Sequence, residues 1–281
     1  EVRKKIKWIK KNKKIFKNKL YDNIMNKLDF NLTKDQIKVL KEINNDLGSQ
    51  SKMFRLLQGD VGSGKTIVSL LTSLNVIESG HQVAFMAPTE ILATQHYTLA
   101  KKIFPKEVNV DILSNKITAR SKKMIAENLK TNKINMIFGT HALFQKRIIF
   151  KNLGLIIIDE EHDHSYKQQE GVIYHARDMA ISLASFEKIP VVMVSATPSL
   201  ETVLNIQEGK YKKLLLPERI GNAVLPVIDF IDMRDEEYVR NQWLSEKLKL
   251  EIEETLSRGE QSLIFLNRRG YAPITLCKSC G

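Results

Sequence analysis

Gly59-Asp60-Val61-Gly62-Ser63-Gly64-Lys65-Thr66 is the stretch that decides the fold of this chain, because it has the G-x-x-x-x-G-K-T spacing of a phosphate-binding loop. An apolar run at residues 54–57 precedes it and predicts a short buried strand. Residues 67–77 follow with apolar side chains at helical spacing and no proline, which predicts a helix. The loop therefore joins a strand to a helix, as a phosphate-binding loop must.

The residue types in this loop suit a bound nucleoside triphosphate. Glycines let the backbone turn tightly and direct several N–H groups at one point, and the N-terminus of the following helix favours an anion there. Lys65 is expected to reach the β- and γ-phosphates, and Thr66 to place its hydroxyl on Mg²⁺. The predicted cofactors are therefore ATP and Mg²⁺, and the predicted binding residues of the loop are Gly59, Gly62, Ser63, Gly64, Lys65 and Thr66.

Composition favours a nucleic-acid-binding protein. The 281 residues include 44 Lys plus Arg against 32 Asp plus Glu, which leaves a formal net charge of +12. This charge favours a polyanionic partner, and nucleic acid more readily than a membrane. There is no run of eighteen apolar residues, and no apolar segment follows the basic N-terminus, so we predict neither a membrane span nor a signal peptide. We therefore expect a soluble, cytoplasmic protein.

Strands and helices alternate beyond the loop. Further strands are predicted at 81–87, 108–113, 135–139 and 153–158, and a Lys-rich helix at about 119–130. Upstream, Thr33 is predicted to cap a helix whose buried stripe includes Ile37, Leu40, Ile43 and Leu47. Apolar strands that alternate with helices predict an α/β fold with a parallel sheet covered on both faces.

The strand predicted at 153–158 ends in Asp159-Glu160-Glu161-His162. Two carboxylates at this point lie at the carboxyl edge of a parallel sheet, where ligands of such sheets bind. Asp159 is expected to hold Mg²⁺ through its water shell, and Glu160 to orient or deprotonate the attacking water. An acidic pair alone often opens a solvated helix, but an upstream phosphate-binding loop makes the signal far more specific. The predicted catalytic residues are Lys65, Asp159 and Glu160.

Six motifs in order make the chain resemble the superfamily 2 DNA helicases. They are a Q-like motif at Gln36, the loop at 59–66, and the segments 87–90, 139–141, 159–162 and 195–198. The resemblance implies a RecA-like ATP-binding lobe followed by a second one, with Gln36 contacting the nucleotide. It also implies DNA-binding or coupling roles for Thr89, Thr140, His141, His162, Ser195 and Thr197.

Two groups of helicases account for different parts of the chain. Residues from about 30 to 158 resemble the RecG branch-migration helicases, as in Met86-Ala87-Pro88-Thr89-Glu90-Ile91-Leu92-Ala93. From residue 159 onward the chain resembles the PriA replication-restart helicases. The segments that carry this resemblance are 159–170, 174–178, 195–202 and 265–273. RecG relatives usually have Gln where Glu161 stands. A natural or artefactual fusion near residue 159 would explain the change.

The PriA resemblance implies an aromatic-rich loop at 166–174 that senses single-stranded DNA beside the ATP site. Tyr166 and Tyr174 would offer stacking faces to bases, and Lys167, His175 and Arg177 would offer charge to phosphate. The alternative is that both tyrosines pack in the core, because buried tyrosines are common.

The resemblance also divides the chain into three parts: a basic helical arm at 1–29, lobe 1 at 30–215, and a linker with the truncated start of lobe 2 at 216–281. Within the last part we expect a helix at 244–256 and a strand at 261–266. Cys277 and Cys280 match the start of a zinc-binding insertion; they are half of a site, so Zn²⁺ is expected only in a full-length protein.

Both ends of the sequence favour a fragment, because it begins at Glu1 rather than Met and stops inside the cysteine pattern. The late motifs of lobe 2, which supply an arginine finger in this superfamily, are expected after residue 281. These residues alone are therefore not expected to unwind DNA.

The leading hypothesis is the motor of an ATP-dependent DNA helicase that acts on forked or branched DNA in replication restart or recombination repair. The expected partners are single-stranded and forked DNA, together with replication-restart proteins. One alternative is a duplex DNA translocase of the restriction or chromatin type, against which the PriA-like loop argues. Another is a non-catalytic DNA-binding fragment. ATP turnover with and without single-stranded and forked DNA separates the three.

Overall fold

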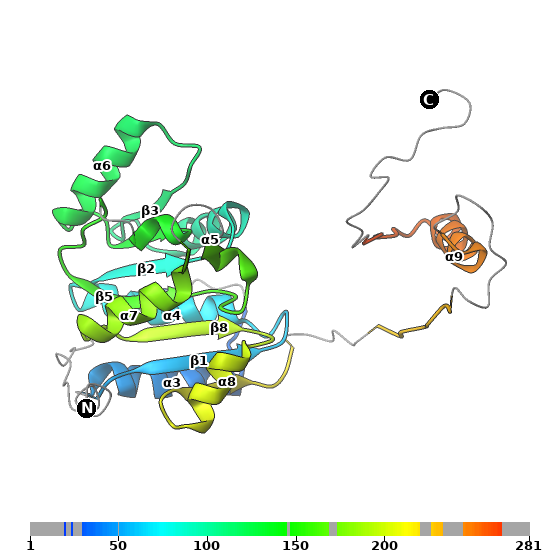
Figure 1. Cartoon of the computed structure of the whole chain (residues 1–281), viewed down its shortest axis with the longest axis horizontal. Helices are drawn as coiled ribbons and strands as arrows, with labels where there is room; N and C mark the ends of the chain where they lie inside the picture. Colours follow the sequence, from blue (N-terminus) through cyan, green and yellow to red (C-terminus); the bar gives the residue numbers. More distant parts are fainter. Residues whose placement is uncertain are drawn as a thin grey trace. The chain divides into compact units, whose positions relative to one another are not determined.

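The computed structural model describes residues 20, 24, 30–49, 51–144, 147–168, 173–219, 226–232 and 244–265. The chain forms two compact units, Glu1–Ala223 and Val224–Gly281 (Figure 1). The expected basic arm at 1–29 lies outside the described residues except for Leu20 and Ile24, of which Ile24 is buried in the core of the first unit.

The first unit is built on a seven-stranded sheet in which every strand pairing is parallel. The strand order is β3-β4-β2-β5-β8-β1-β9. This confirms the predicted α/β fold with a parallel sheet. The strands are β1 (Phe54–Gly59), β2 (Gln82–Met86), β3 (Val110–Leu113), β4 (Met136–Gly139), β5 (Leu153–Ile158), β8 (Val191–Ser195) and β9 (Lys212–Leu216).

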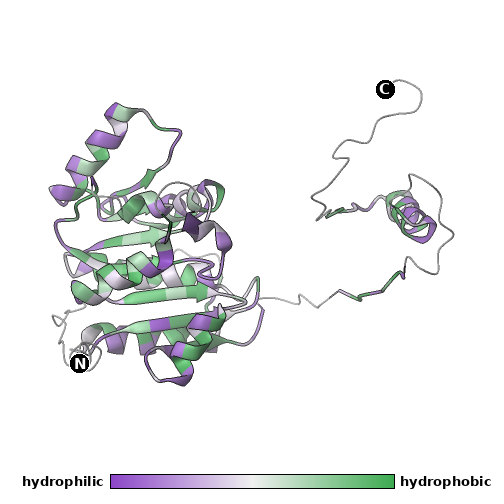
Figure 2. Ribbon diagram, viewed as in Figure 1, coloured by the Kyte–Doolittle hydropathy of each residue, from purple (hydrophilic) through white to green (hydrophobic). Residues whose placement is uncertain are grey.

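Helices cover both faces of this sheet, because the strands are apolar on both sides (Figure 2). Along β5, Leu155 and Ile157 face one hydrophobic core, and Ile156 and Ile158 face the other. The first core is covered by α3 (Lys34–Gly48), α4 (Lys65–Glu78) and α5 (Glu90–Ile103). The second is covered by α6 (Ala119–Lys130), α7 (Ala176–Phe186) and α8 (Leu200–Gln207).

Helix starts follow the capping residues in the sequence. The Thr33 side chain accepts from the Gln36 N–H at 3.2 Å, and the Gln36 side chain accepts from the Thr33 N–H at 3.0 Å, which is a capping box. Thr89 caps α5 and Ser199 caps α8, each with a single side-chain hydrogen bond. These caps fix where the chain leaves the sheet edge that carries the motifs.

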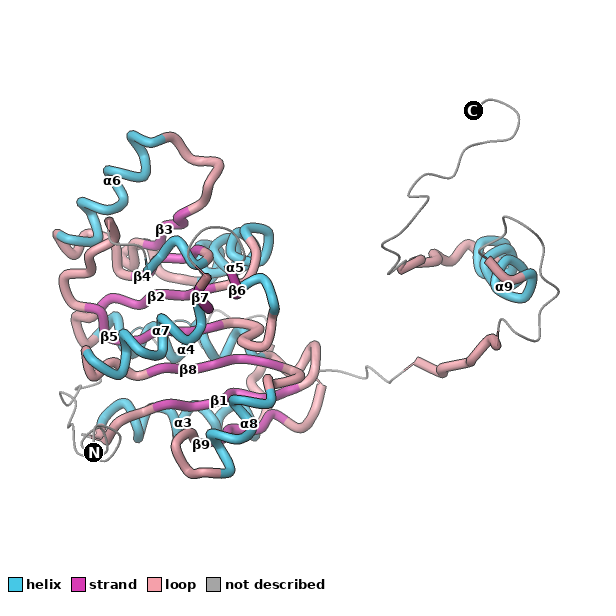
Figure 3. The backbone as a smooth tube through the Cα atoms, in the orientation of Figure 1, coloured by secondary structure: helices cyan, strands magenta, loops and turns pink. Residues whose placement is uncertain are grey.

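Short secondary-structure elements lie at the sheet edge that carries the motifs (Figure 3). A 3₁₀ turn, η1 (His141–Phe144), follows β4, and a second, η2 (His164–Tyr166), follows the acidic motif after β5. A small antiparallel hairpin then pairs β6 (Lys167–Gln168) with β7 (Tyr174–His175). The described residues of the predicted aromatic-rich loop therefore belong to the end of η2 and to the paired strands β6 and β7, and α7 follows directly.

In the second unit the described residues contain one helix, α9 (Glu246–Ser257), capped by Ser245. The strand predicted at 261–266 is wrong for its described part, because residues 261–265 pair with no strand. With none of the described strands beside them, Leu263 and Phe265 are exposed. Across the described ranges of both units, no helix is long and apolar enough to cross a membrane.

Candidate nucleotide-binding site

Five of the six sequence motifs follow five strands of the sheet at their carboxyl ends. The segments 59–66, 87–90, 139–141, 159–162 and 195–198 follow or complete β1, β2, β4, β5 and β8, respectively. Because all these strands are parallel, the motifs share one edge of the sheet. Strand β8 lies between β5 and β1, so the motif at 195–198 is placed between the phosphate-binding loop and the acidic motif.

The loop after β1 has the shape of an anion cradle. Gly62 and Gly64 adopt left-handed backbone angles (φ 83° and 84°), and Gly64 directly precedes α4. A side chain on Gly59 would collide with the Ser63 hydroxyl, because an added Cβ would lie 2.4 Å from it. The buried Ser63 Oγ has no protein partner within the described residues. Glycine geometry, the helix N-terminus and this unused hydroxyl together fit a bound phosphate chain.

Lys65 closes the loop on itself. Its Nζ donates to the carbonyls of Gly59 at 2.8 Å and Asp60 at 3.0 Å, and its side chain is buried. These two carbonyls hold the ammonium group at the mouth of the cradle, where a phosphate would exchange for one of them. Thr66 follows in the first turn of α4, directly after the cradle.

Gln36 supports the loop rather than presenting a free amide to the nucleotide. It is fully buried, and its Nε2 donates to the Ser63 carbonyl at 2.9 Å. Its Oε1 is already used by the Thr33 N–H. Each end of the amide thus has one protein partner, and the contact of Gln36 with the nucleotide stays a prediction.

The acidic motif after β5 begins with Asp159, which is 5% exposed. Its Oδ2 lies 2.7 Å from Nε2 of His96 on α5. His96 is not among the site residues predicted from the sequence. Glu160 next to it adopts a left-handed backbone angle (φ 43°), which is unusual for a side chain of this kind. Burial, followed by the neighbouring Asp159 carboxylate, raises the pKa of Glu160 above its ordinary value. A raised pKa suits a group that accepts a proton from water.

The residues at this edge fit Mg²⁺ bound together with a nucleotide. Magnesium usually takes one or two protein ligands beside water and phosphate oxygens, which matches Thr66 and Asp159. A self-contained metal centre would need more ligands, and no group of three or more His, Cys, Asp and Glu side chains is assembled in the described parts of the chain. The predicted half zinc site at Cys277 and Cys280 lies outside the described residues.

Glu161, the third residue of the acidic motif, is a buried structural anchor. It is fully shielded from solvent, and its Oε2 accepts from Arg177 Nη1 at 2.9 Å, from Ser199 Oγ at 3.0 Å and from Thr202 Oγ1 at 2.9 Å. Its Oε1 accepts from the Ser199 N–H at 2.8 Å. Glu161 therefore ties the acidic motif to α7 and to the start of α8.

His162 links the acidic motif to the motif after β8. Its Nδ1 lies 2.8 Å from Ser195 Oγ, and its Nε2 lies 3.3 Å from Thr197 Oγ1. On the other side of that motif, the Gln58 amide donates to the Ala196 carbonyl at 3.3 Å. The structure thus brings His162, Ser195 and Thr197 together. They lie between the phosphate-binding loop after β1 and the acidic residues after β5.

Two residues of the predicted DNA-sensing loop are buried. Tyr166 is 1% exposed, and its hydroxyl donates to the Asp159 carbonyl at 2.6 Å and to the Met86 carbonyl at 3.2 Å. Arg177 is 6% exposed and paired with Glu161. These positions do not support base stacking by Tyr166 or direct phosphate contact by Arg177, because Tyr166 lies in the core and the Arg177 guanidinium is held by Glu161. Lys167 in the hairpin is exposed.

The remaining predicted DNA contacts lie on the same edge. Thr89 is exposed at the start of α5, whereas Thr140 is buried after β4 and His141 is half-buried at the start of η1. Their common position is a consequence of the parallel sheet, and their contact with DNA stays a prediction.

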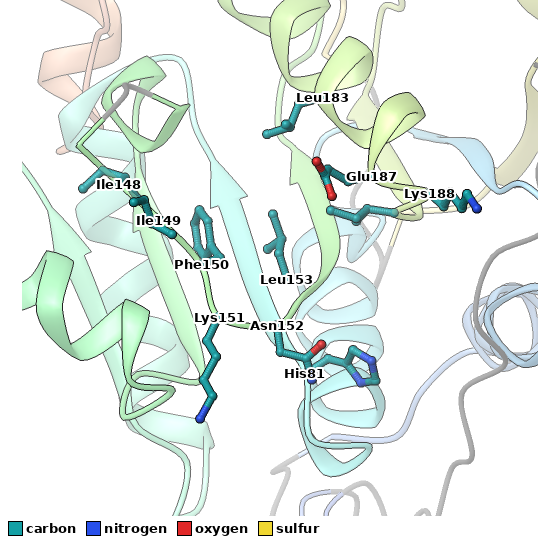
Figure 4. A pocket seen from close by; sticks show the side chains of 11 residues that line it. His81, Ile148, Ile149, Phe150, Lys151, Asn152, Leu153, Leu183, Glu187 and Lys188 are labelled. Carbon is teal, nitrogen blue, oxygen red and sulfur yellow. The ribbon is translucent and has the colours of Figure 1, made fainter.

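A separate cavity of about 480 Å³ lies at the opposite edge of the sheet, near the amino ends of β2 and β5 (Figure 4). Phe150 and Leu153 lie on one side of it, and Leu183 of α7 lies on the other, with His81 at its rim. None of the sequence motifs contributes to it. The cavity is therefore distinct from the nucleotide-binding edge.

The family model for DEAD/DEAH box helicases matches residues 33–206. Replication restart protein PriA of Rickettsia felis is 42% identical over 234 residues, covering 83% of this chain and 35% of the relative. ATP-dependent DNA helicase RecG of Aquifex aeolicus is 46% identical over 228 residues, covering 73% of this chain and 29% of the relative. The chain thus spans about a third of the length of these curated relatives.

A solved structure of RecG bound to a three-way DNA junction superimposes with a TM-score of 0.64 at 34% identity, covering 80% of this chain and 29% of that one. The PriA alignment is long enough to include residue 159, so similarity to PriA continues on both sides of that position and a fusion is not needed to explain it. The matched residues 33–206 contain the loop, the acidic motif and the motif after β8, and the chain belongs to the DEAD/DEAH box helicase family.

Proposed function

We propose that this chain is the ATP-hydrolysing motor lobe, with the beginning of the second lobe, of a DNA helicase that acts on forked or branched DNA. One observation carries the proposal: a single sheet edge gathers the phosphate cradle, the Asp159–Glu160 pair and the motif after β8. The PriA and RecG names of the relatives support DNA as the partner and replication restart or recombination repair as the process. Replication-restart proteins as partners, and the cytoplasm as the location, rest on those names.

The chemistry follows from the residues at this edge. The cradle of backbone N–H groups and Lys65 would bind and orient the phosphates, and Thr66 and Asp159 would hold Mg²⁺. Magnesium would neutralise charge on the phosphates when bound. Glu160 would orient the attacking water and accept its proton, which its raised pKa favours.

The DNA side of the proposal uses the exposed residues of the same edge. Thr89 and Lys167 are exposed there and would contact the backbone of a DNA strand. His162 contacts both Ser195 and Thr197, and its Nδ1 also lies 3.6 Å from Glu160 Oε2. A shift of the motif after β8 would therefore reach the water-orienting carboxylate through His162. This contact supports His162, Ser195 and Thr197 as coupling residues.

The test compares ATP turnover of the chain alone, with single-stranded DNA, with an uninterrupted duplex and with a forked duplex. We expect DNA to stimulate turnover, and His162→Ala to reduce the stimulated increment more than the basal rate. Equal stimulation by uninterrupted duplex and forked DNA would favour a duplex translocase. No nucleotide binding at all would contradict the proposal.

A further inference from the structure

His96 reaches the magnesium site from a helix that carries no residue of the acidic motif. It lies on α5, and its Nε2 is 2.7 Å from Asp159 Oδ2, across 63 residues of sequence. Both residues are buried, with 8% of His96 and 5% of Asp159 exposed. The bond is therefore shielded from water and is not a transient surface contact.

The surroundings of the His96 ring fix its orientation. The Phe85 ring on β2 lies with its centroid 4.8 Å from the His96 ring. An ionised carboxylate only accepts hydrogen bonds, so Nε2 must carry the hydrogen in this pair. The ring thus presents one donor at one position, and it meets one oxygen of Asp159.

This bond leaves the second carboxylate oxygen of Asp159 for the metal. A carboxylate that holds Mg²⁺ through its water shell works only if it is presented in the right rotamer, and partners behind a metal ligand commonly provide that orientation. Tyr166 fixes the same residue at its main chain, because its hydroxyl donates to the Asp159 carbonyl. His96 is the partner of the side chain itself.

We propose that His96 is a positioning residue that holds Asp159 for magnesium-dependent nucleotide binding. The inference rests on the proposed function, since it takes Asp159 as the Mg²⁺ residue. It does not make His96 a catalytic residue, because the ring touches neither the nucleotide cradle nor Glu160 in the contacts described above. Its effect should appear in the advantage that Mg²⁺ gives to nucleotide binding, and only through that in turnover.

The experiment measures the affinity of the 281-residue chain for a fluorescent ATP analogue, once with Mg²⁺ and once with EDTA. His96→Leu fills the space without a donor. We expect it to weaken binding about 10- to 100-fold with Mg²⁺, the usual effect of removing such a partner, and to leave binding in EDTA unchanged. His96→Gln, whose amide N–H reaches about as far as Nε2, should restore most of the magnesium advantage.

Two further variants make the result specific. His96→Asn keeps an amide but is too short to reach Asp159, so it should behave like His96→Leu; it also serves if His96→Leu fails to fold. His81→Leu is the control histidine, because His81 lies at the opposite edge of the sheet beside the cavity in Figure 4. It should bind nucleotide like the unaltered chain under both conditions.

Two results would overturn the inference while leaving the proposed function intact. One is equal weakening by His96→Leu or His96→Asn with Mg²⁺ and with EDTA, which would assign a general packing role. The other is an undiminished magnesium advantage in either of these variants. If the unaltered chain itself gains nothing from Mg²⁺, or binds no nucleotide, the proposed function fails together with the inference.

Discussion

Glu161 and Arg177 form a buried ion pair in which Arg177 Nη1 lies 2.9 Å from Glu161 Oε2, with 0% and 7% of the two side chains exposed. The pair joins the acidic motif that follows β5 to helix α7. Buried charges are tolerated only when they are paired and hydrogen-bonded, and Glu161 satisfies this with donors from Arg177, Ser199 and Thr202. The buried carboxylate therefore depends on this network for its hydrogen-bond partners.

Arg177→Met should destabilise the chain strongly, because it leaves a buried carboxylate without its cation. Removal of one partner from a buried pair typically costs about 3–5 kcal/mol. The matched control is Asp178→Asn, since Asp178 pairs with Arg177 at the surface with 58% of its side chain exposed, and exposed pairs contribute about 0–1 kcal/mol. Urea unfolding of both variants checks the difference. Equal losses would show that the buried contact contributes no more than the exposed one.

Lys65→Ala should abolish detectable nucleotide binding while the chain stays folded. The ammonium group lies at the mouth of the cradle and is the only charge that the loop itself directs at a phosphate. Titration with a fluorescent ATP analogue measures the loss, and Lys213→Ala on the exposed side of β9 is the control. Unchanged affinity in folded Lys65→Ala protein would remove the basis of the nucleotide-site assignment.

Glu160→Gln should abolish ATP hydrolysis and at the same time stabilise the chain. The pKa of Glu160 is raised in the folded state, so the ionised carboxylate is disfavoured by folding. Stability is therefore lost as the pH rises from the ordinary value of 4.5 through the raised pKa, and the cost is fully present above it. Removal of the charge should raise the melting temperature at pH 8 by on the order of 1–3 °C.

The gain should vanish when the pH falls below 4.5, where the carboxyl is protonated in both the folded and the unfolded chain. Melting curves in EDTA at several pH values measure this. Glu161→Gln is the contrasting variant, because that carboxylate is satisfied by buried donors and its neutralisation should lower stability. A loss of stability in Glu160→Gln at pH 8 would contradict the direction of the shift.

The sequence predicts which residues gather at the site because the topology makes the prediction simple. Residues that follow parallel strands share one edge, so the spacing of residues 59–66 and 159–162 from their strands was sufficient. Strand β8 is different, since its four apolar residues, 191–194, form a run too short for periodicity to assign. Its place between β5 and β1 is set by tertiary packing, and no local sequence pattern predicts it.

The partners of the site residues were harder to predict. His96 lies 63 residues before Asp159 and is one polar side chain on a helix, without a motif of its own. Gln36 carries the signal of a capping residue as well as that of a nucleotide contact, and the structure uses it for the cap and for the loop. Arg177 beside two tyrosines fits a DNA surface as well as a buried pair. Only the packing of α7 distinguishes a buried Arg177 from one on a DNA-binding surface.

Tyr166→Phe should lower stability without changing DNA affinity, because the ring is part of the core and only the hydroxyl meets polar groups. The hydroxyl donates to the carbonyls of Asp159 and Met86, and the Met86 carbonyl keeps a second donor in the Asp159 N–H at 2.8 Å. The variant therefore leaves mainly the Asp159 carbonyl without its partner, at a cost of about 1–3 kcal/mol. Tyr174→Phe in the half-buried hairpin is the control.

Burial, followed by the charge of Asp159, raises the pKa of Tyr166 well above its ordinary value, so this hydroxyl stays a donor wherever the chain is folded. In an alkaline absorbance titration, the folded unaltered chain should therefore retain one more neutral tyrosine than folded Tyr166→Phe does. If Tyr166→Phe instead keeps full stability and weakens DNA binding more than Tyr174→Phe does, then the ring must leave the core to meet DNA, and the buried position described above is not the one that binds.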